Sequence, residues 1–142
     1  MQAIDNMYIV GDTLQAIAYE KDFEHIMLGM DRLLAAHPNL KLERWIDFAR
    51  KHGTDESQRK HYECNAKRIV TIWGPPVDDY SARVWSGLIR DYYLPRWKHY
   101  FASRKTGKTF DFASWERNWV ERSQGCSKVI VPNDVLWQKF ET

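Results

Sequence analysis

The sequence lacks any long apolar run. No stretch approaches the roughly eighteen consecutive apolar residues that a membrane-spanning helix requires. The first residues, MQAIDNMYIVGD, lack the basic start and apolar stretch of a secretory signal. We therefore expect no membrane insertion, and any export signal must lie outside this sequence.

Residues with metal-binding or cofactor-binding spacing are also missing. The two cysteines, Cys64 and Cys126, show no metal-ligand spacing, and they neither establish nor exclude a disulfide. The five histidines form no HExxH pair and no His/Cys cluster. The string GKT at 107–109 follows Ala102, where a phosphate-binding loop requires glycine. The sequence thus predicts no metal and no cofactor.

Charge of one sign is not in excess. Lys and Arg number 21 against 19 Asp and Glu, which gives a net charge of +2. Binding to a phosphate backbone depends on a concentrated basic field. The charge balance therefore predicts no nucleic-acid partner.

What the sequence does contain is an ordinary globular composition with many aromatic residues. Its 142 residues are 44% hydrophobic and 28% charged, which is typical of one soluble domain. Aromatic residues make up 14%, with seven Trp and seven Tyr. Such side chains combine an apolar body with a polar edge, so they indicate a cleft or an interface.

Apolar residues recur at helical spacing in the first half of the chain. A long helix is predicted from Asp12 to about His37, and a second one follows with Asn39 as its cap and Gly53 as a left-handed stop. The inward positions of the first are Ala16, Tyr19, Phe23, Ile26, Met30 and Leu33, widened by Met27 and Leu34, and those of the second are Leu42, Trp45, Ile46 and Ala49.

The same pattern continues through the middle of the chain. A third helix is predicted after Thr54 as cap and ends at residues 74–76, and a fourth begins at Asp79 and is kinked at Pro95. The inward positions of the third are Tyr62, Ala66, Ile69 and Trp73, and those of the fourth are Tyr80, Val84, Leu88 and Tyr92.

The last part of the chain is predicted to add one or two short helices. Residues 103–109 form a polar loop, after which Asp111 caps a helix that Gly125 closes, with Phe112, Trp115, Trp119 and Val120 inward. The tail 128–141 starts with β-branched residues but ends at helical spacing, which favours a short final helix. The predicted fold class is all-α, a bundle of about five to six helices with one kinked at Pro95.

Two carboxyl groups can together supply general acid and general base catalysis. The candidates in the chain are Glu63 and Asp79. Lys67 follows Glu63 by four residues, which is the orientation that favours a helical ion pair, and Asp79 has a ready role as a helix cap. No catalytic residue is therefore predicted.

The run YECNAKRIVTIWGPPVDDYSARVWSGLIRDYYLPRW, residues 62–97, closely resembles the C-terminal region of alpha-N-acetylglucosaminidases of glycoside hydrolase family eighty-nine. The most specific matches are Tyr62-Glu63 with Asn65, Trp73-Gly74-Pro75, Asp79-Tyr80, Gly87-Leu88, Tyr92-Tyr93 and Pro95-Arg96-Trp97. Weaker similarity extends back through RWIDFAR and MDRLLAAH, and residues beyond about Phe101 match only as a generic helical tail. Cys64 departs from the family pattern, where a polar residue is usual.

The resemblance implies an exo-acting enzyme that removes terminal alpha-linked N-acetylglucosamine and carries its two catalytic glutamates in a central barrel. A barrel of ~250 residues cannot be formed by this chain. We therefore expect residues 1–142 to be one helical domain, the C-terminal domain of a larger glycosidase, inactive alone and partnered by the catalytic barrel and by terminal N-acetylglucosamine glycans. The family resemblance suggests a periplasmic, secreted or lysosomal location.

Within such a domain, Trp73 and Tyr80, with Asp79 as a weaker candidate, are predicted to line the substrate pocket, because they flank a turn between rigid helices. The alternative for Trp73 is packing at the end of a helix, and the alternative for Asp79 is a helix cap. Tyr92, Tyr93, Arg96 and Trp97 are predicted to be interdomain or structural, with Arg96 available to the carbonyls that Pro95 frees.

Two other functions remain open at this point. An independent carbohydrate-binding module would also use many Trp and Tyr residues, provided that they are exposed. A helical protein-interaction module would use the same Trp, Tyr and Arg composition at an interface.

Overall fold

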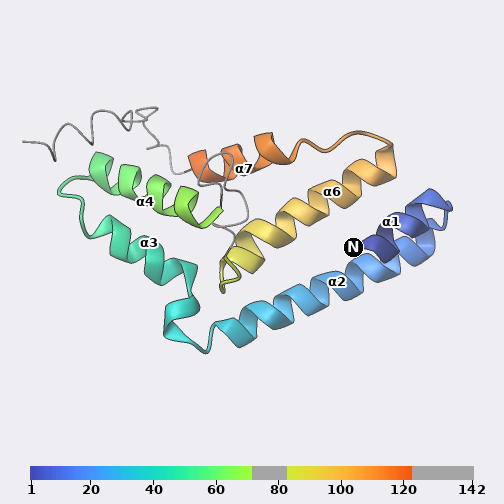
Figure 1. Cartoon of the computed structure of the whole chain (residues 1–142), viewed down its shortest axis with the longest axis horizontal. Helices are drawn as coiled ribbons and strands as arrows, with labels where there is room; N and C mark the ends of the chain where they lie inside the picture. The colour runs from blue at the N-terminus through green and yellow to red at the C-terminus, as the bar shows by residue number, and fades with distance from the viewer. Residues whose placement is uncertain (72–82, 123–142) are drawn as a thin grey trace, which may run out of the picture.

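A computed structural model of the chain describes residues 1–71 and 83–122, and these two stretches are helical almost throughout (Figure 1). They contain six α-helices, a 3-10 turn and a short π-helix. Within these stretches the strand-like pairing is limited to one isolated bridge between Lys41 and Ser86. The predicted all-α class, with its number of helices, is confirmed.

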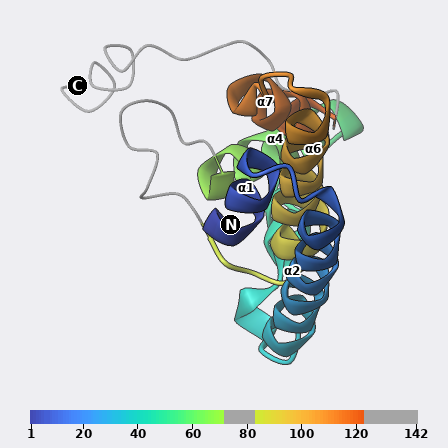
Figure 2. The ribbon, with the colours of Figure 1, turned by 90° about the vertical axis from the view of Figure 1, so that its right-hand side faces the viewer.

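Two helical hairpins form opposite ends of the described structure. The first joins α1 (Gln2–Ile9) to α2 (Thr13–Leu34), and α6 (Leu94–Thr106) packs along both of these helices (Figures 1 and 2). The second joins α3 (Leu42–Arg50) to α4 (Glu56–Thr71) after a 3-10 turn, η1 (Pro38–Leu40). No helix is predicted from the sequence over the residues of α1.

The two ends are connected through a core that α7 completes. Helix α7 (Phe112–Glu121) packs on both α4 and α6, and a π-helix, η2 (Ile89–Tyr93), runs directly into α6. The core cluster draws on α3, α4, α7 and the segment around η2, and consists of Leu42, Cys64, Val70, Leu88, Tyr92, Trp119 and Val120. Burial of these side chains is what holds the second hairpin to the rest of the chain.

Helix α2 begins where predicted, but its predicted inward stripe is partly wrong. The Asp12 side chain caps it by accepting a hydrogen bond from Gln15 N at 3.1 Å. Ala16 is buried as expected, whereas Ile26 is 59% exposed and Leu33 is 77% exposed. The apolar pattern of α2 is wider than the face that α1, α6 and η2 cover, so a second stripe remains on its surface.

The ends of α3 and α4 are also made differently from the prediction. Lys41, not Asn39, occupies the N-cap of α3. Asp55, not Thr54, caps α4, because its side chain accepts a hydrogen bond from Gln58 N at 2.9 Å. Gly53 is not among the described glycines with positive φ. It is required for space instead, because a Cβ atom there would lie 2.6 Å from Arg59 N.

The inward face of α4 differs from the predicted one. Ala66 is buried as predicted, but Tyr62 and Ile69 are exposed. Cys64 and Val70 occupy the core in their place. The adjacent α3 and α7 pack against α4 from directions that periodicity alone does not specify.

The fourth predicted helix starts later than expected. Residues 83–85 carry no regular structure, Val84 is exposed, and helical winding begins at Leu88. The irregularity predicted at Pro95 appears as the π-helix η2 immediately before it. Proline lacks the N–H that would bond the carbonyl of Asp91, and Trp119 Nε1 donates to that carbonyl instead, at 3.0 Å.

The loop after α6 is shorter than predicted. Helix α6 continues to Thr106, and Gly107 ends it with a left-handed φ of 67°. Asp111 then caps α7, where Trp119 and Val120 are buried as predicted. The predicted stop at residues 74–76, the Gly125 stop, Cys126 and the tail 128–141 lie outside the described residues.

Candidate functional site

Three residues predicted to contact substrate, Trp73, Asp79 and Tyr80, fall in residues 72–82, outside the described part of the chain. The structure describes what lies on either side of this segment: α4 as far as Thr71, and the chain again from Arg83. The candidate site is therefore built from the described residues that hold these two ends in place.

Asp31 of α2 holds the start of the helix that leads into η2. Its buried carboxylate accepts hydrogen bonds from Gly87 N at 2.7 Å, Arg90 N at 3.3 Å and Ser86 Oγ at 3.4 Å. The first N–H groups of a helix have no partner within the helix, and a negative charge is favourable there. Asp31 thus acts as a helix cap supplied from another helix.

The turn at Gly87 fixes α3 against the same point. Gly87 has a φ of +87°, and a Cβ atom there would lie 3.1 Å from Leu42 Cβ. The backbone on either side pairs with the entry to α3: Leu42 N donates to Ser86 O at 2.9 Å, and Ser86 N donates to Leu40 O at 2.8 Å. Helices α2 and α3 therefore both position the chain that emerges from residues 72–82.

A second anchor surrounds Arg96, between α6 and α7. Its guanidinium forms an ion pair with Glu116, and Tyr92 OH donates to the same carboxylate at 2.7 Å. The guanidinium carbon lies 5.2 to 5.4 Å from the ring centroids of Tyr92, Tyr93 and Trp97. Of the four residues predicted to be interdomain or structural, Tyr92, Tyr93 and Trp97 thus surround the fourth, Arg96. The ion-pair partner of Arg96, Glu116, is not predicted from the sequence.

The electrostatics of this cluster keep the tyrosines neutral. Burial, with the hydrogen bond to Glu116 as a second cause, raises the pKa of Tyr92 far above its ordinary value. Burial also raises the pKa of Tyr93, although Arg96 opposes the shift. Tyr92 therefore remains protonated and donates its hydrogen bond to Glu116. The carbonyl of Asp91 accepts a hydrogen bond from Trp119 rather than from Arg96.

Glu63 is held as an ionised structural carboxylate. Lys67 Nζ lies 2.9 Å and Arg50 Nη1 lies 2.8 Å from its two oxygens. Burial opposes ionisation of this group, but the hydrogen bonds from Lys67 and Arg50 outweigh it and lower the pKa of Glu63. A general acid needs the opposite shift, so Glu63 serves to join α3 to α4.

Among residues 1–71 and 83–122, no group of three or more His, Cys, Asp or Glu side chains is arranged to hold a metal ion. Within the same ranges, no helix has the length and apolar character needed to cross a membrane.

Comparison with known proteins identifies the chain's relatives. The family model described as "Alpha-N-acetylglucosaminidase (NAGLU) C-terminal domain" matches residues 1–134. The chain belongs to this family. Human alpha-N-acetylglucosaminidase is 32% identical over 84 residues, which are 58% of this chain and 11% of the human protein. No solved structure gives a significant match.

The match places both anchors inside the alpha-N-acetylglucosaminidase C-terminal domain. It extends to residue 134, well beyond the limit near Phe101 that the sequence motifs indicated, so α7 and Glu116 belong to the family's domain. The chain matches only a small part of the length of the human protein.

The sequence carried only a weak signal for Asp31. It lies one helical turn from Met27 and from Leu34, on the side of α2 that also carries Ala16, but Glu20 and Glu24 share that side. Buried carboxylates require hydrogen-bond partners, and in this alpha-N-acetylglucosaminidase domain the partners are 55 to 59 residues away along the chain. No comparable signal marked Glu116.

Proposed function

We propose that this chain is the accessory C-terminal domain of an exo-acting alpha-N-acetylglucosaminidase, which packs on the catalytic barrel and lines part of the pocket for terminal alpha-linked N-acetylglucosamine. The observation that carries the proposal is the family match over residues 1–134. The catalytic carboxylates belong to the barrel, and this domain contributes binding.

In this proposal, Trp73, Tyr80 and Asp79 contact the sugar. The two anchors support the assignment because they hold the chain next to these residues: Asp31 fixes Gly87, and Arg96 lies among Tyr92 and Tyr93. A pocket wall must be held rigidly to orient a substrate against carboxylates that another domain supplies.

The uncovered stripe of α2 supports packing on another domain. Ile26, Met30 and Leu33 are 59%, 40% and 77% exposed, and they lie within about 60° of one another around the helix axis. Apolar side chains gathered on one helix face, with no charge among them, are typical of the centre of a protein interface. The catalytic barrel is the partner that family membership suggests.

The test is turnover of an aryl alpha-N-acetylglucosaminide by the chain alone and after mixing with a separately produced catalytic domain of the same enzyme. We expect no turnover by the chain alone and turnover in the mixture. Trp73→Ala is expected to lower kcat/KM in the mixture by at least about tenfold. Turnover by the chain alone, or a mixture that stays inactive, would overturn the proposal.

The packing surface is tested in the same mixture with a matched pair of leucines. Leu33→Asp, on the stripe, should weaken association of the two domains. Leu14→Asp introduces the same change at a site that is 83% exposed but lies about 100° away around α2, and it should have no effect. Equal effects of the two substitutions would show that the stripe is not the contact.

A further inference from the structure

Hollows lie along α3, and the largest of them lies between α3, Ala35 at the end of α2 and the turn at Gly87. Three adjoining hollows of about 440, 340 and 200 Å³ lie there, and Lys41 lines all three. Phe48 and Arg44 line the two smaller ones, and Asp47 lines the two larger ones. We call this surface the α3 groove and define it by Lys41, Glu43, Arg44, Asp47, Phe48 and Trp85.

Aromatic rings form one part of the α3 groove. Phe48 is 61% exposed, although it belongs to a helix whose opposite face is in the core. Trp85 stands edge to face with Trp45, with ring centroids 6.0 Å apart, and Trp45 Nε1 is fixed by its hydrogen bond to Ala66 O at 2.9 Å. The smallest hollow is therefore lined by the rings of Trp45, Phe48 and Trp85, and aromatic rings suit the apolar C–H face of a sugar ring.

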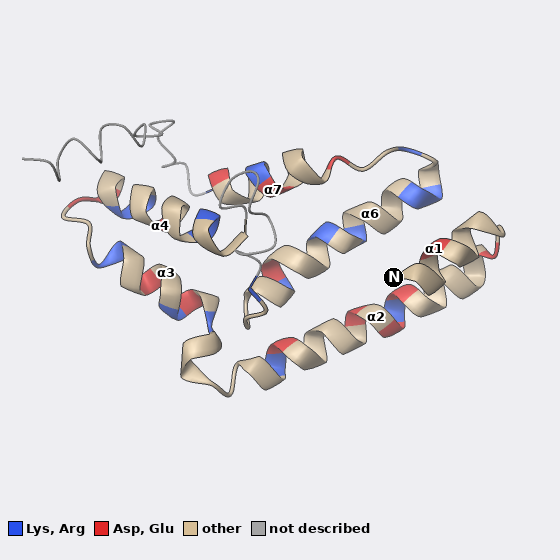
Figure 3. Cartoon of the chain, viewed as in Figure 1, with Lys and Arg blue, Asp and Glu red and all other residues tan. Residues whose placement is uncertain are grey.

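Charges of both signs line the rest of the α3 groove, as Figure 3 shows along α3. Lys41, Arg44 and Asp47 form no ion pair with any residue in the described parts of the chain. By contrast, Arg50, on the side of α3 that faces α4, is held by Glu56 and Glu63. The α3 groove thus presents both hydrogen-bond donors and hydrogen-bond acceptors that no ion pair occupies.

This combination favours a neutral saccharide over the other classes of ligand. Hydroxyl groups both donate and accept, so they match a lining of mixed charge. The three hollows are lined by four basic residues, Lys41, Arg44, Lys51 and Arg90, and three acidic ones, Glu43, Asp47 and Asp91. These charges nearly balance, so the lining does not select an anion, and the centre of a protein interface is usually depleted of charge. The aliphatic stripe of α2 has that depleted character, and the α3 groove does not.

We propose that the α3 groove binds the neutral part of a glycan that lies beyond the terminal sugar. This inference rests on the proposed function, in which the terminal sugar contacts Trp73 and Tyr80. Trp85 follows Tyr80 by five residues, so the chain itself limits the separation of their Cα atoms to about 18 Å. The groove is therefore within reach of one oligosaccharide that also occupies the pocket.

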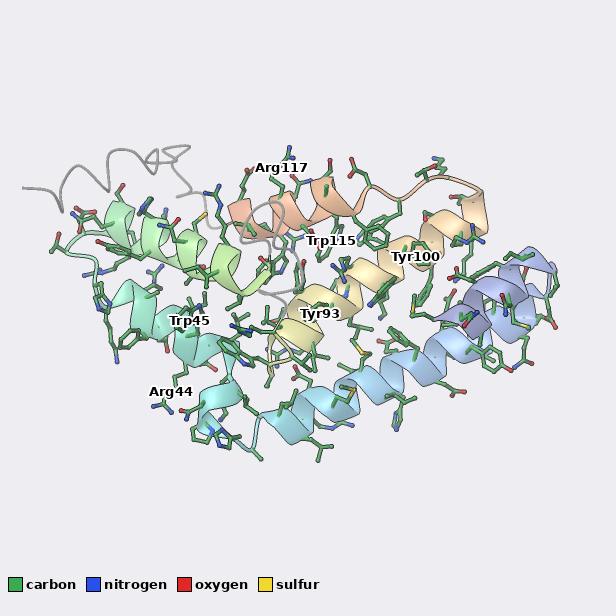
Figure 4. All side chains as sticks on the ribbon, viewed as in Figure 1. Arg44, Trp45, Tyr93, Tyr100, Trp115 and Arg117 are labelled. Atoms are coloured by element: carbon green, nitrogen blue, oxygen red, sulfur yellow. The ribbon has the colours of Figure 1, made fainter. Side chains whose placement is uncertain are left out.

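The experiment titrates the full chain, residues 1–142, with the neutral tetrasaccharide chitotetraose, using Trp fluorescence and calorimetry. We expect saturable binding that Phe48→Ala and Arg44→Ala each weaken by about tenfold. Arg117→Ala is the matched control, because Arg117 is also exposed but projects from α7, on the other side of the molecule from Arg44 (Figure 4). It should bind as the unsubstituted chain does, and circular dichroism checks that all variants are folded.

Several results would overturn the inference. Absence of saturable binding, or equal affinity in Phe48→Ala, Arg44→Ala and Arg117→Ala, would remove the groove as a saccharide site. Tighter binding of a sulfated tetrasaccharide, lost in high salt, would make it an anion-binding surface. A dimer that Phe48→Ala dissociates in sedimentation would make it a protein interface.

Turnover in the mixed-domain assay without saccharide binding would overturn this inference alone. Saccharide binding without turnover would overturn the proposed function alone.

Discussion

Helix α7 and the helix that begins at Leu88 both start at a carboxylate cap, but the caps come from different places. Asp111 immediately precedes α7 and accepts a hydrogen bond from Ser114 N at 3.0 Å. The helix at Leu88 is capped by Asp31, whose partner Gly87 N lies 56 residues away in sequence. The local cap was predictable from its position in the sequence, and the distant one was not.

The two caps differ in what they stabilise. A local cap is a property of one helix and stabilises that helix alone. The Asp31 cap joins α2 to the segment that follows the predicted substrate-contacting residues, and it forms only when the tertiary structure is complete. The segment that follows the predicted substrate-contacting residues thus depends for its cap on a distant part of the chain.

Asp31→Ala is the substitution with the largest expected effect. It leaves Gly87 N and Arg90 N without their acceptor in a buried site, so the free energy of unfolding should fall by roughly 2 to 4 kcal/mol. Urea unfolding followed by circular dichroism measures this. Asp31→Asn retains one acceptor oxygen and should lose less. A loss below about 1 kcal/mol for the alanine variant would mean that the distant cap is no stronger than a local one.

Gly87→Ala is expected to have an intermediate effect. The positive φ of +87° is unfavourable for alanine, and the new Cβ atom would lie 3.1 Å from Leu42 Cβ, so we expect a loss of about 1 to 2 kcal/mol in the same measurement. Gly29→Ala is the control, because Gly29 is within α2 and a Cβ atom there meets nothing within 4 Å. The control should stabilise the chain slightly, and similar losses in both variants would contradict the explanation.

Asp111→Ala should have the smallest effect, and that effect should depend on pH. Hydrogen bonds from Ser114 hold the pKa of Asp111 below its ordinary value of 3.8. Stability from a lowered pKa is present above the unfolded-state value and is lost as the pH falls through the folded-state value. The variant should therefore have a lower Tm than the unsubstituted chain at pH 7, and the difference should shrink near pH 3. A Tm difference that is unchanged at low pH would show that the carboxylate charge does not contribute.

The difference between local and distant contacts also explains which predictions from the sequence succeeded. Helix α2 with its Asp12 cap, α7 with its Asp111 cap and the Glu63–Lys67 pair depend on residues within four positions of one another, and the structure contains all three. The predicted helix start at Asp79 lies outside the described residues. The helix expected over Val84 is absent, and the helix begins only after Gly87. Glu116, the partner of Arg96, lies 20 residues away, and its spacing carried no sign of that contact.

The sequence by itself determined the helical class, most helix positions and, through its motifs, the family. Helical periodicity and local caps arise between neighbouring residues, so they can be read from the order of residues alone. Only the tertiary structure decided which stripe of α2 is buried, which carboxylate caps the helix at Leu88 and which groups on α3 remain uncommitted. Those outcomes depend on how helices from distant parts of the chain pack, because a side chain is buried or paired only by what lies against it.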